Sequence, residues 1–363
     1  MKSTGIAVLQ ETCIQREEEI LSGQPRNKNA LCIYSVYPLH EACQIGCVPC
    51  TEFLLNMGAD VHKLYRGKNP LHEACQHETT EWAELLVKYG ANINALCSVQ
   101  LSALNYACSA KSFACAEFLL EMGASVYFPE SPSSPLHDAC EQSDVDLAEM
   151  LIYYGANINA VDRDNRTPLL TACRWSSNPC VEFLVNLGAD VNIAPDNDTV
   201  LHTSCIRGFP EYTALLIRAG ANLDVNYHNR GTPLYNAAFS CQPLCARILL
   251  RAGALVNLAI PVDRDTPLHV AAIEADLEVA KVLIEFGADV YARNDENKTP
   301  VDILDEREGE LYNLLVQTAA QPVPLKDLCR RKIRSTFGGY RMESLHKLKL
   351  PQSLLLYLMH DTI

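Results

Sequence analysis

Apolar residues recur along this chain in a fixed order, with a period close to 33 residues. One repeated motif is Pro-Leu-His-x-Ala-Cys or a degenerate form of it, and its successive copies begin at Pro38, Pro70, Ala103, Pro135, Pro168, Val200, Pro233, Pro267 and Pro300. A second motif, Gly-Ala followed by Asp, Asn, Ser or Leu, recurs with the same period from Gly58 to Gly287. Two motifs with one period indicate a repeat architecture, in which every unit has the same local structure.

Each unit is predicted to contain two helices. A Thr-Pro pair starts the first helix, and the small Ala-Cys pair within it permits close packing. The second helix is apolar, as in residues 83–87, and ends at Gly-Ala, where glycine accepts the left-handed backbone of a helix end. The Asp- and Asn-rich residues that follow predict an extended turn to the next unit.

These features resemble the ankyrin repeat, whose Thr-Pro-Leu-His and Gly-Ala-Asp signatures stand at residues 266–269 and 287–289. The resemblance covers residues 31–318 and implies an all-α solenoid of about nine repeats, the last of which ends differently. In that last unit the polar run at residues 305–310 is predicted to form a terminal cap, because the outer side of a final repeat has no neighbour.

The two ends of the chain differ from the repeats. Residues 1–30 form an N-terminal extension with a predicted short helix at about residues 11–21. Two interpretations stay open for it: a frayed polar tail, or a segment that caps the first repeat or crosses its binding face. At the other end, residues 319–323 form a proline-punctuated linker to a tail at residues 324–363.

The tail contains a short amphipathic segment at residues 324–333. If it is a helix, Leu325, Leu328, Cys329 and Ile333 lie on one face. Pro324 suits the first turn of such a helix, where the missing N–H group has no helical partner to lose. A helix this short is marginal alone, so its apolar stripe must pack either on the repeats or on a partner.

Composition indicates an intracellular, soluble protein. Of the 363 residues 48% are hydrophobic and 20% are charged, and no apolar run is long enough to cross a membrane. The N-terminus has no secretory signal pattern, so the sixteen cysteines are expected to be reduced. We therefore expect a location in the cytoplasm, with the nucleus as an alternative, and no membrane partner.

The formal charge of −14 is unevenly distributed. Residues 321–363 hold 8 Lys and Arg against 3 Asp and Glu, which leaves 22 against 41 for the rest of the chain. Because phosphate binding requires a basic surface, the acidic body argues against a nucleic acid partner.

The cysteines and histidines follow the repeat and indicate structure more than chemistry. Ligands of a metal must converge on one point, whereas a column of equivalent residues runs along the array. Cys47 and Cys50 form a Cys-x-x-Cys pair, but no second pair stands at zinc spacing. The cysteines of the column are Cys43, Cys75, Cys108, Cys140, Cys173 and Cys205.

Five histidines share one repeat position, where we expect a ring nitrogen to bond a neighbouring turn. They are His40, His72, His137, His202 and His269. A catalytic base would not be copied into each unit, and the sequence contains no nucleophile elbow, phosphate-binding loop or His-Glu-x-x-His motif. The sequence therefore predicts a protein without catalytic residues, cofactor or metal.

The repeats offer a binding surface instead. In ankyrin arrays the concave side is lined by the first helix and the turn tips, so the exposed positions there carry specificity. Tyr, Trp and Arg are the residue types that most often anchor interfaces. The alternative is that Trp175 and Phe239 fill gaps between repeats. The candidate substrate-binding residues are Glu41, Glu73, Tyr106, Asp138, Arg174, Trp175, Arg207 and Phe239.

The tail is similar to a SOCS box. In the elongin-C-binding helix of that box a small residue and Leu are followed four positions on by Cys and four further by an aliphatic residue, as at Leu325, Cys329 and Ile333. Residues 348–351 and the apolar residues after them are similar to the cullin-selecting half, although Lys349 stands where that half has its first proline. The whole chain thus resembles the ankyrin repeat and SOCS box family.

Members of that family are substrate receptors of elongin and cullin-five ubiquitin ligases, and the resemblance implies three partners. Leu325 would enter an apolar pocket of elongin C, itself bound to elongin B, and Leu328, Cys329 and Ile333 would complete the contact. An unidentified protein substrate would bind the repeats. The residues implied to face cullin five, with its RING subunit, are Leu348, Leu350, Pro351, Leu354, Tyr357 and Leu358.

On this interpretation the chain catalyses nothing itself and brings a substrate close to a ubiquitin-loaded enzyme. The alternative is an ankyrin-repeat scaffold or adaptor without ligase function. The stripe of the tail would then pack on the ninth repeat as a C-terminal cap.

Overall fold

The computed structural model describes residues 38–45, 47–76, 80–129, 131–194, 198–227, 230–304 and 309–320. Within these ranges the structure is all-helical: no β-strand occurs, and three isolated β-bridges close loops between repeats. The helices come in pairs at the predicted period, which confirms the predicted fold class. The predicted helix at residues 11–21 and the tail at residues 324–363 lie outside the described residues.

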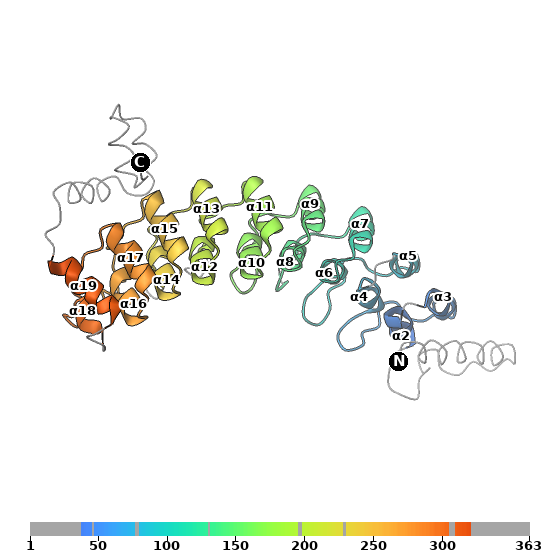
Figure 1. The fold of residues 1–363 in the computed structure, drawn as a ribbon. Coiled ribbons are helices and arrows are strands. Elements are labelled where there is room, and N and C mark those ends of the chain that lie inside the picture. The colour runs from blue at the N-terminus through green and yellow to red at the C-terminus, as the bar shows by residue number, and fades with distance from the viewer. Residues whose placement is uncertain are drawn as a thin grey trace, which may run out of the picture. The chain divides into compact units, whose positions relative to one another are not determined.

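The chain divides into two units after Phe183. In the first unit α2, α4, α6, α8 and α10 pack in sequence as one layer, and the second helices of the repeats form another, where α3 packs on α5 and α7 on α9. Figure 1 shows both rows. The helices are α2 (Pro38–Ile45), α3 (Val48–Asn56), α4 (Pro70–Ala74), α5 (Glu81–Lys88), α6 (Ala103–Ser109), α7 (Phe113–Glu121), α8 (Pro135–Glu141), α9 (Val145–Tyr153), α10 (Pro168–Arg174) and α11 (Asn178–Asn186), the last of which crosses the division.

The second unit has the same two layers. Here α12, α14, α16 and α18 pack in sequence, and so do α13, α15, α17 and α19. Their bounds are α12 (Val200–Arg207), α13 (Pro210–Arg218), α14 (Pro233–Phe239), α15 (Pro243–Ala252), α16 (Pro267–Ile273), α17 (Leu277–Glu285), α18 (Pro300–Ile303) and α19 (Glu310–Ala320).

The predicted start and stop signals act as expected. At α14 the side chain of Thr232 accepts a hydrogen bond from the backbone N–H of Tyr235, at 3.0 Å, and Pro233 occupies the first helical position. At the end of α7, Gly123 has a φ of +89° and its N–H bonds the carbonyl of Leu120, while Ala124 N bonds Leu119 O at 2.8 Å. This double bond pattern is a Schellman motif, which satisfies the last carbonyl groups of the helix.

Side chains from one repeat bond the backbone of the next. The Nε2 atom of His72 lies 3.2 Å from the carbonyl oxygen of Leu101, and that of His137 lies 2.8 Å from Arg166 O. The same contact is made by His40, His202 and His269, which confirms the predicted role of the column. In the second unit Asn192 adds a further link: its Nδ2 donates to Gly220 O at 3.1 Å.

Burial favours the neutral form of four of these histidines. Desolvation lowers the pKa of His40, His137 and His202, and it lowers the pKa of His72 to about 4. At His72 the backbone N–H of Asn69 donates to Nδ1, so Nε2 carries the proton that the Leu101 carbonyl accepts.

The cysteine column lies in the core. Cys43, Cys75, Cys108, Cys140, Cys173 and Cys205 are all fully buried, and the residue before each, alanine in five repeats and Ser204 in the sixth, is equally buried. This confirms that they pack as small hydrophobic residues. Cys47 and Cys50 are also buried, and the Cys47 thiol donates to Cys50 Sγ at 2.7 Å. Among the residues that the structure describes, no group of three His, Cys, Asp or Glu residues could hold a metal ion.

The end of the array differs from the prediction in one respect. The outer helix of the ninth repeat is α19, which begins at Glu310, the last residue of the polar run; residues 305–308 lie outside the described ranges. The helix buries Leu311 and Leu315 and continues through Ala320, so the first two residues of the predicted linker are helical. Alanine is the strongest helix former, which explains the extension. No described helix is long and apolar enough to cross a membrane.

Candidate protein interaction surface

In each of the first eight repeats an exposed side chain stands near the end of the first helix, six positions after the start of the motif. We call these positions the terminal row. In the first unit the row is polar, with Gln44, Gln76, Ser109, Glu141 and Arg174. In the second unit it is apolar: Ile206, Phe239 and Ile273 are 36%, 57% and 52% exposed. Three exposed apolar side chains in consecutive repeats form the kind of patch that marks a protein contact.

Trp175 and Phe239 do not fill gaps between repeats. Their exposed fractions are 56% and 57%, far above those of core residues such as Leu136 and Leu234, which are fully buried. The gap-filling alternative is therefore wrong for both. Arg174, a member of the row, and Arg207, which directly follows Ile206, are exposed as well.

The predicted residues nearer the N-terminus are less accessible. Glu41, Glu73, Tyr106 and Asp138 stand three positions after the start of their motifs. All four are half-buried, so the expectation that these positions are exposed is wrong. The physical reason is that neighbouring repeats use these side chains. Lys68 Nζ lies 3.6 Å from a carboxylate oxygen of Glu73 and 4.4 Å from the centroid of the Tyr106 ring.

Lys68, Glu73 and Tyr106 thus form one group, which we call the Lys68 cluster. The ring of Tyr106 also meets the ring of His72 edge to face, at 5.3 Å between centroids, and its hydroxyl lies 3.6 Å from Cys97 Sγ. Burial raises the pKa of Tyr106, so its hydroxyl stays protonated at neutral pH. A partner could contact the outer edge of this cluster, where one cation meets an aromatic face.

Asp138 belongs to a separate polar group. Its carboxylate accepts hydrogen bonds from Asn105 Nδ2 at 2.6 Å and from Ser133 Oγ at 3.0 Å. Desolvation raises the pKa of Asp138 to about 7, although both bonds favour the charged form. Asn105 stands at the histidine position of its repeat and also donates to Ser133 O, so it makes the bridge that histidine makes elsewhere.

The eight predicted substrate-binding residues therefore do not form one cluster. Glu73 and Tyr106 are joined through Lys68, and Asp138 is engaged separately. Six of the eight lie in the first unit, while Arg207 and Phe239 lie in the second. The sequence analysis missed Ile206 and Ile273, which the period alone could have found, because they stand at the position of Phe239 in the repeats before and after it.

The residues predicted to contact elongin C and the cullin lie outside the described residues. They are Leu325, Leu328, Cys329 and Ile333, then Leu348, Leu350, Pro351, Leu354, Tyr357 and Leu358.

Paired helices, histidine bridges between repeats and an exposed row without catalytic chemistry define the class: a helical repeat protein that presents surfaces to other proteins. Comparison with known sequences gives the family. The family model described as ankyrin repeats matches residues 18–97, 39–130, 128–195 and 187–260, and a related one matches residues 249–304. The SOCS box model matches residues 321–359. This chain belongs to the ankyrin repeat and SOCS box family, as its sequence motifs predict.

Curated relatives carry the same name. Ankyrin repeat and SOCS box protein 9 of Mus musculus is 36% identical over 160 residues, which cover 44% of this chain and 54% of the relative. Protein 5 of the same series from Oryctolagus cuniculus is 39% identical over 153 residues, or 42% of this chain and 46% of the relative. Human protein 11 is 32% identical over 161 residues, or 44% and 49%. Each match spans about half the length of the relative.

A solved structure described as the human ASB11 ankyrin repeat domain is 24% identical to this chain. It covers 79% of this chain and all of that domain, with a TM-score of 0.33.

Proposed function

We propose that this chain is the substrate-recognition subunit of an elongin B/C–cullin-five–RING E3 ubiquitin ligase. One observation carries the proposal: an ankyrin array with an exposed apolar row is joined, in one chain, to a SOCS box at residues 321–359. The first part suits the capture of a protein, and the second suits attachment to a ligase.

The ligase side is assigned to the tail. Leu325, Leu328, Cys329 and Ile333 dock on elongin C, and residues 348–358 contact the cullin. Burial of a large apolar side chain contributes roughly 1.5–3 kcal/mol, so one short stripe supplies a substantial contact before association costs are subtracted. Lys326 and Arg330, which directly follow Leu325 and Cys329, are not part of the proposed contact.

The substrate side is assigned to the first helices. Ile206, Phe239 and Ile273 form the apolar centre on the second unit, and Arg207 lies next to it. On the first unit Trp175 and Arg174 are the exposed anchors. Apolar and aromatic side chains with a neighbouring Arg are the composition expected of an interface centre.

The proposed role requires no catalytic group. A bound substrate is held near the ubiquitin-loaded enzyme, so its effective concentration rises to the level of an intramolecular reaction. The partner enzymes determine the rate of ubiquitin transfer, and the affinity of the ankyrin array for its ligand determines which protein is modified.

The test is co-purification of the full-length chain with elongin B and C. Leu325→Ala together with Cys329→Ala is expected to abolish recovery of elongin while the melting temperature stays within about 2 °C of wild type. Lys326→Ala with Arg330→Ala is the matched control, because it truncates the two side chains that directly follow Leu325 and Cys329 and leaves the stripe unchanged. A double mutant that kept elongin, or that lost stability instead, would favour the C-terminal cap and a scaffold without ligase function.

A further inference from the structure

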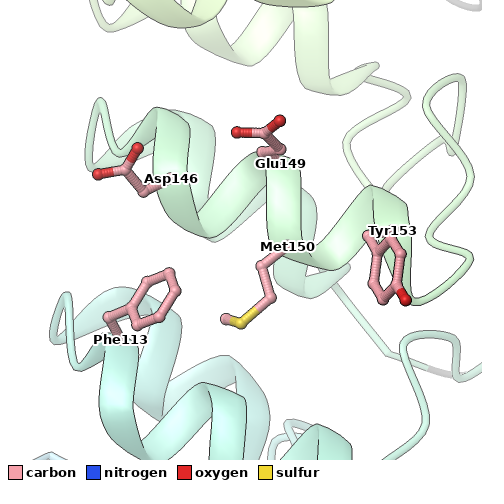
Figure 2. Close-up of a pocket in the computed structure, with 5 residues that line it drawn as sticks. All are labelled: Phe113, Asp146, Glu149, Met150 and Tyr153. Carbon is pink, nitrogen blue, oxygen red and sulfur yellow. The ribbon is translucent and has the colours of Figure 1, made fainter.

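A groove in the second-helix layer of the first unit forms a second surface. It lies between α7 and α9, has a volume of about 560 Å³, and is lined by Phe113, Asp146, Glu149, Met150 and Tyr153. Figure 2 shows Phe113 and Met150 projecting into the space between the two helices, with Tyr153 farther along α9. The substrate surface proposed above lies on first helices, so this groove is separate from it.

Apolar side chains are exposed along the groove. Met150 is 9% exposed and forms the floor, whereas Phe113 is 40% exposed and Tyr153 is 84% exposed. Single exposed apolar residues are normal on a protein surface, but three that line one groove form a contiguous patch. The ring of Tyr153 touches only the adjacent Tyr154 ring, at 5.4 Å between centroids, among the ring contacts in the described part of the chain.

The charge around the groove has one sign. Glu117 and Glu121 are exposed on α7, and Asp146 and Glu149 are exposed on α9. Neither helix contains a Lys, Arg or His residue, and the one basic residue within five positions of either helix is Lys111. A surface of this kind repels phosphate and attracts cationic side chains.

These features select the occupant. A small ligand is normally enclosed over most of its surface, which a groove bounded by a largely exposed tyrosine cannot do. The described residues offer no strand edge to which a peptide could add a strand. A helix can place apolar side chains at positions i, i+3 or i+4, and i+7 into a groove while charged residues flank the stripe.

We propose that the α7–α9 groove binds a basic amphipathic helix of a partner protein. Apolar side chains of that helix cover Met150 and pack between Phe113 and Tyr153. Its Lys or Arg residues pair with Asp146 and Glu149 along α9, and with Glu117 on α7.

The test is selection of random helical peptides of about 15 residues, displayed on phage, against the full-length chain. Peptides are then sorted by whether Tyr153→Asp removes their binding. The expected peptides carry an apolar stripe flanked by Lys and Arg, bind about tenfold or more weakly to Tyr153→Asp, and lose affinity as salt is raised. Tyr127→Asp is the control for this substitution, because Tyr127 is 64% exposed in the same unit and does not line the groove.

Charge reversal provides the second arm. Asp146→Lys with Glu149→Lys is expected to weaken the basic peptides about tenfold or more and to select acidic ones instead. Glu52→Lys with Glu182→Lys changes the net charge of the chain by the same amount on exposed positions outside the groove, and should leave the basic peptides bound. The proposal is overturned if no peptide depends on Tyr153, or if those that do have no excess of basic residues.

Discussion

His72 and its four counterparts act as hydrogen-bond bridges between repeats. In the folded chain His72 donates from Nε2 and accepts at Nδ1, so protonation would place a second N–H against the Asn69 N–H group. This geometry predicts that the stability of the repeats depends on pH.

The pH dependence can be tested with His72→Asn. The ordinary histidine pKa is 6.5 and the folded value for His72 is about 4, so the unfolded chain binds one more proton between these values. Stability should therefore be complete above about pH 6.5 and fall as the pH decreases toward 4, by up to about 3 kcal/mol from this residue. Asparagine can keep the bridge without titrating, as Asn105 does in the next repeat.

The measurement is the free energy of unfolding in urea at several pH values for both proteins. Wild type should lose more stability than His72→Asn as the pH is lowered, and all other titrating groups cancel in the difference. Parallel curves for the two proteins would show that His72 does not titrate in this way.

At the same scale, Phe239→Glu tests the apolar part of the terminal row. Because the side chain is 57% exposed, the substitution should leave the melting temperature almost unchanged and weaken a substrate by about 2 kcal/mol or more if Phe239 is an anchor. Leu244→Glu is the control, since Leu244 is 63% exposed on α15 of the same unit. Equal effects of both substitutions on partner binding would remove the row from the substrate surface.

The sequence predicts the roles of the histidine and cysteine columns, but it does not predict which side chains of neighbouring repeats contact each other. The period placed His72 correctly because its partner is the same backbone group in each repeat. It misjudged Glu73, Tyr106 and Asp138, whose exposure depends on the side chains of Lys68, Asn105 and Ser133. The residue types at these partner positions change from repeat to repeat, so the period alone does not predict the pairings.

Individual helices are defined mainly by their ends. Thr-Pro starts and Gly-Ala stops are local signals, so the sequence predicted the helix pairs correctly. The extension of α19 through Ala320 was missed because no stop signal stands before Pro322. The α7–α9 groove was also missed, since a groove depends on which side chains of two helices face each other.

Gly123→Ala tests the end of α7. A Cβ atom at Gly123 would meet nothing within 4 Å, so the cost comes from the positive φ alone and should be about 1 kcal/mol. Gly123→Asn should cost less, because asparagine tolerates this conformation. Chemical denaturation of the three proteins gives both values, and an alanine variant as stable as wild type would contradict the proposed stop signal.

The whole chain combines an acidic array with a basic tail, and its two proposed partner surfaces belong to different segments of the sequence. Residues 321–363 contain the SOCS box match, and their net charge is positive, whereas that of the rest of the chain is negative. This separation suits a receptor, because substrate and ligase can be bound at the same time.

Lys349→Pro tests the cullin contact. The family pattern has a proline there, and a proline that fits the bound conformation contributes about 0.4–1 kcal/mol by restricting the free chain. Affinity for cullin five, measured by calorimetry on the chain already bound to elongin B and C, should rise about two- to fivefold. Lys347→Pro is the control outside the motif, and equal gains for both variants would argue against a specific role of position 349.

The most direct test of the receptor proposal is affinity capture from cells under proteasome inhibition, with three forms of the chain compared quantitatively. The Leu325→Ala, Cys329→Ala variant should lose elongin B, elongin C and the cullin and keep a substrate. Phe239→Glu should lose the substrate and keep the ligase subunits. The account is contradicted if both variants lose the same partners, or if the ligase subunits are absent from the wild-type capture.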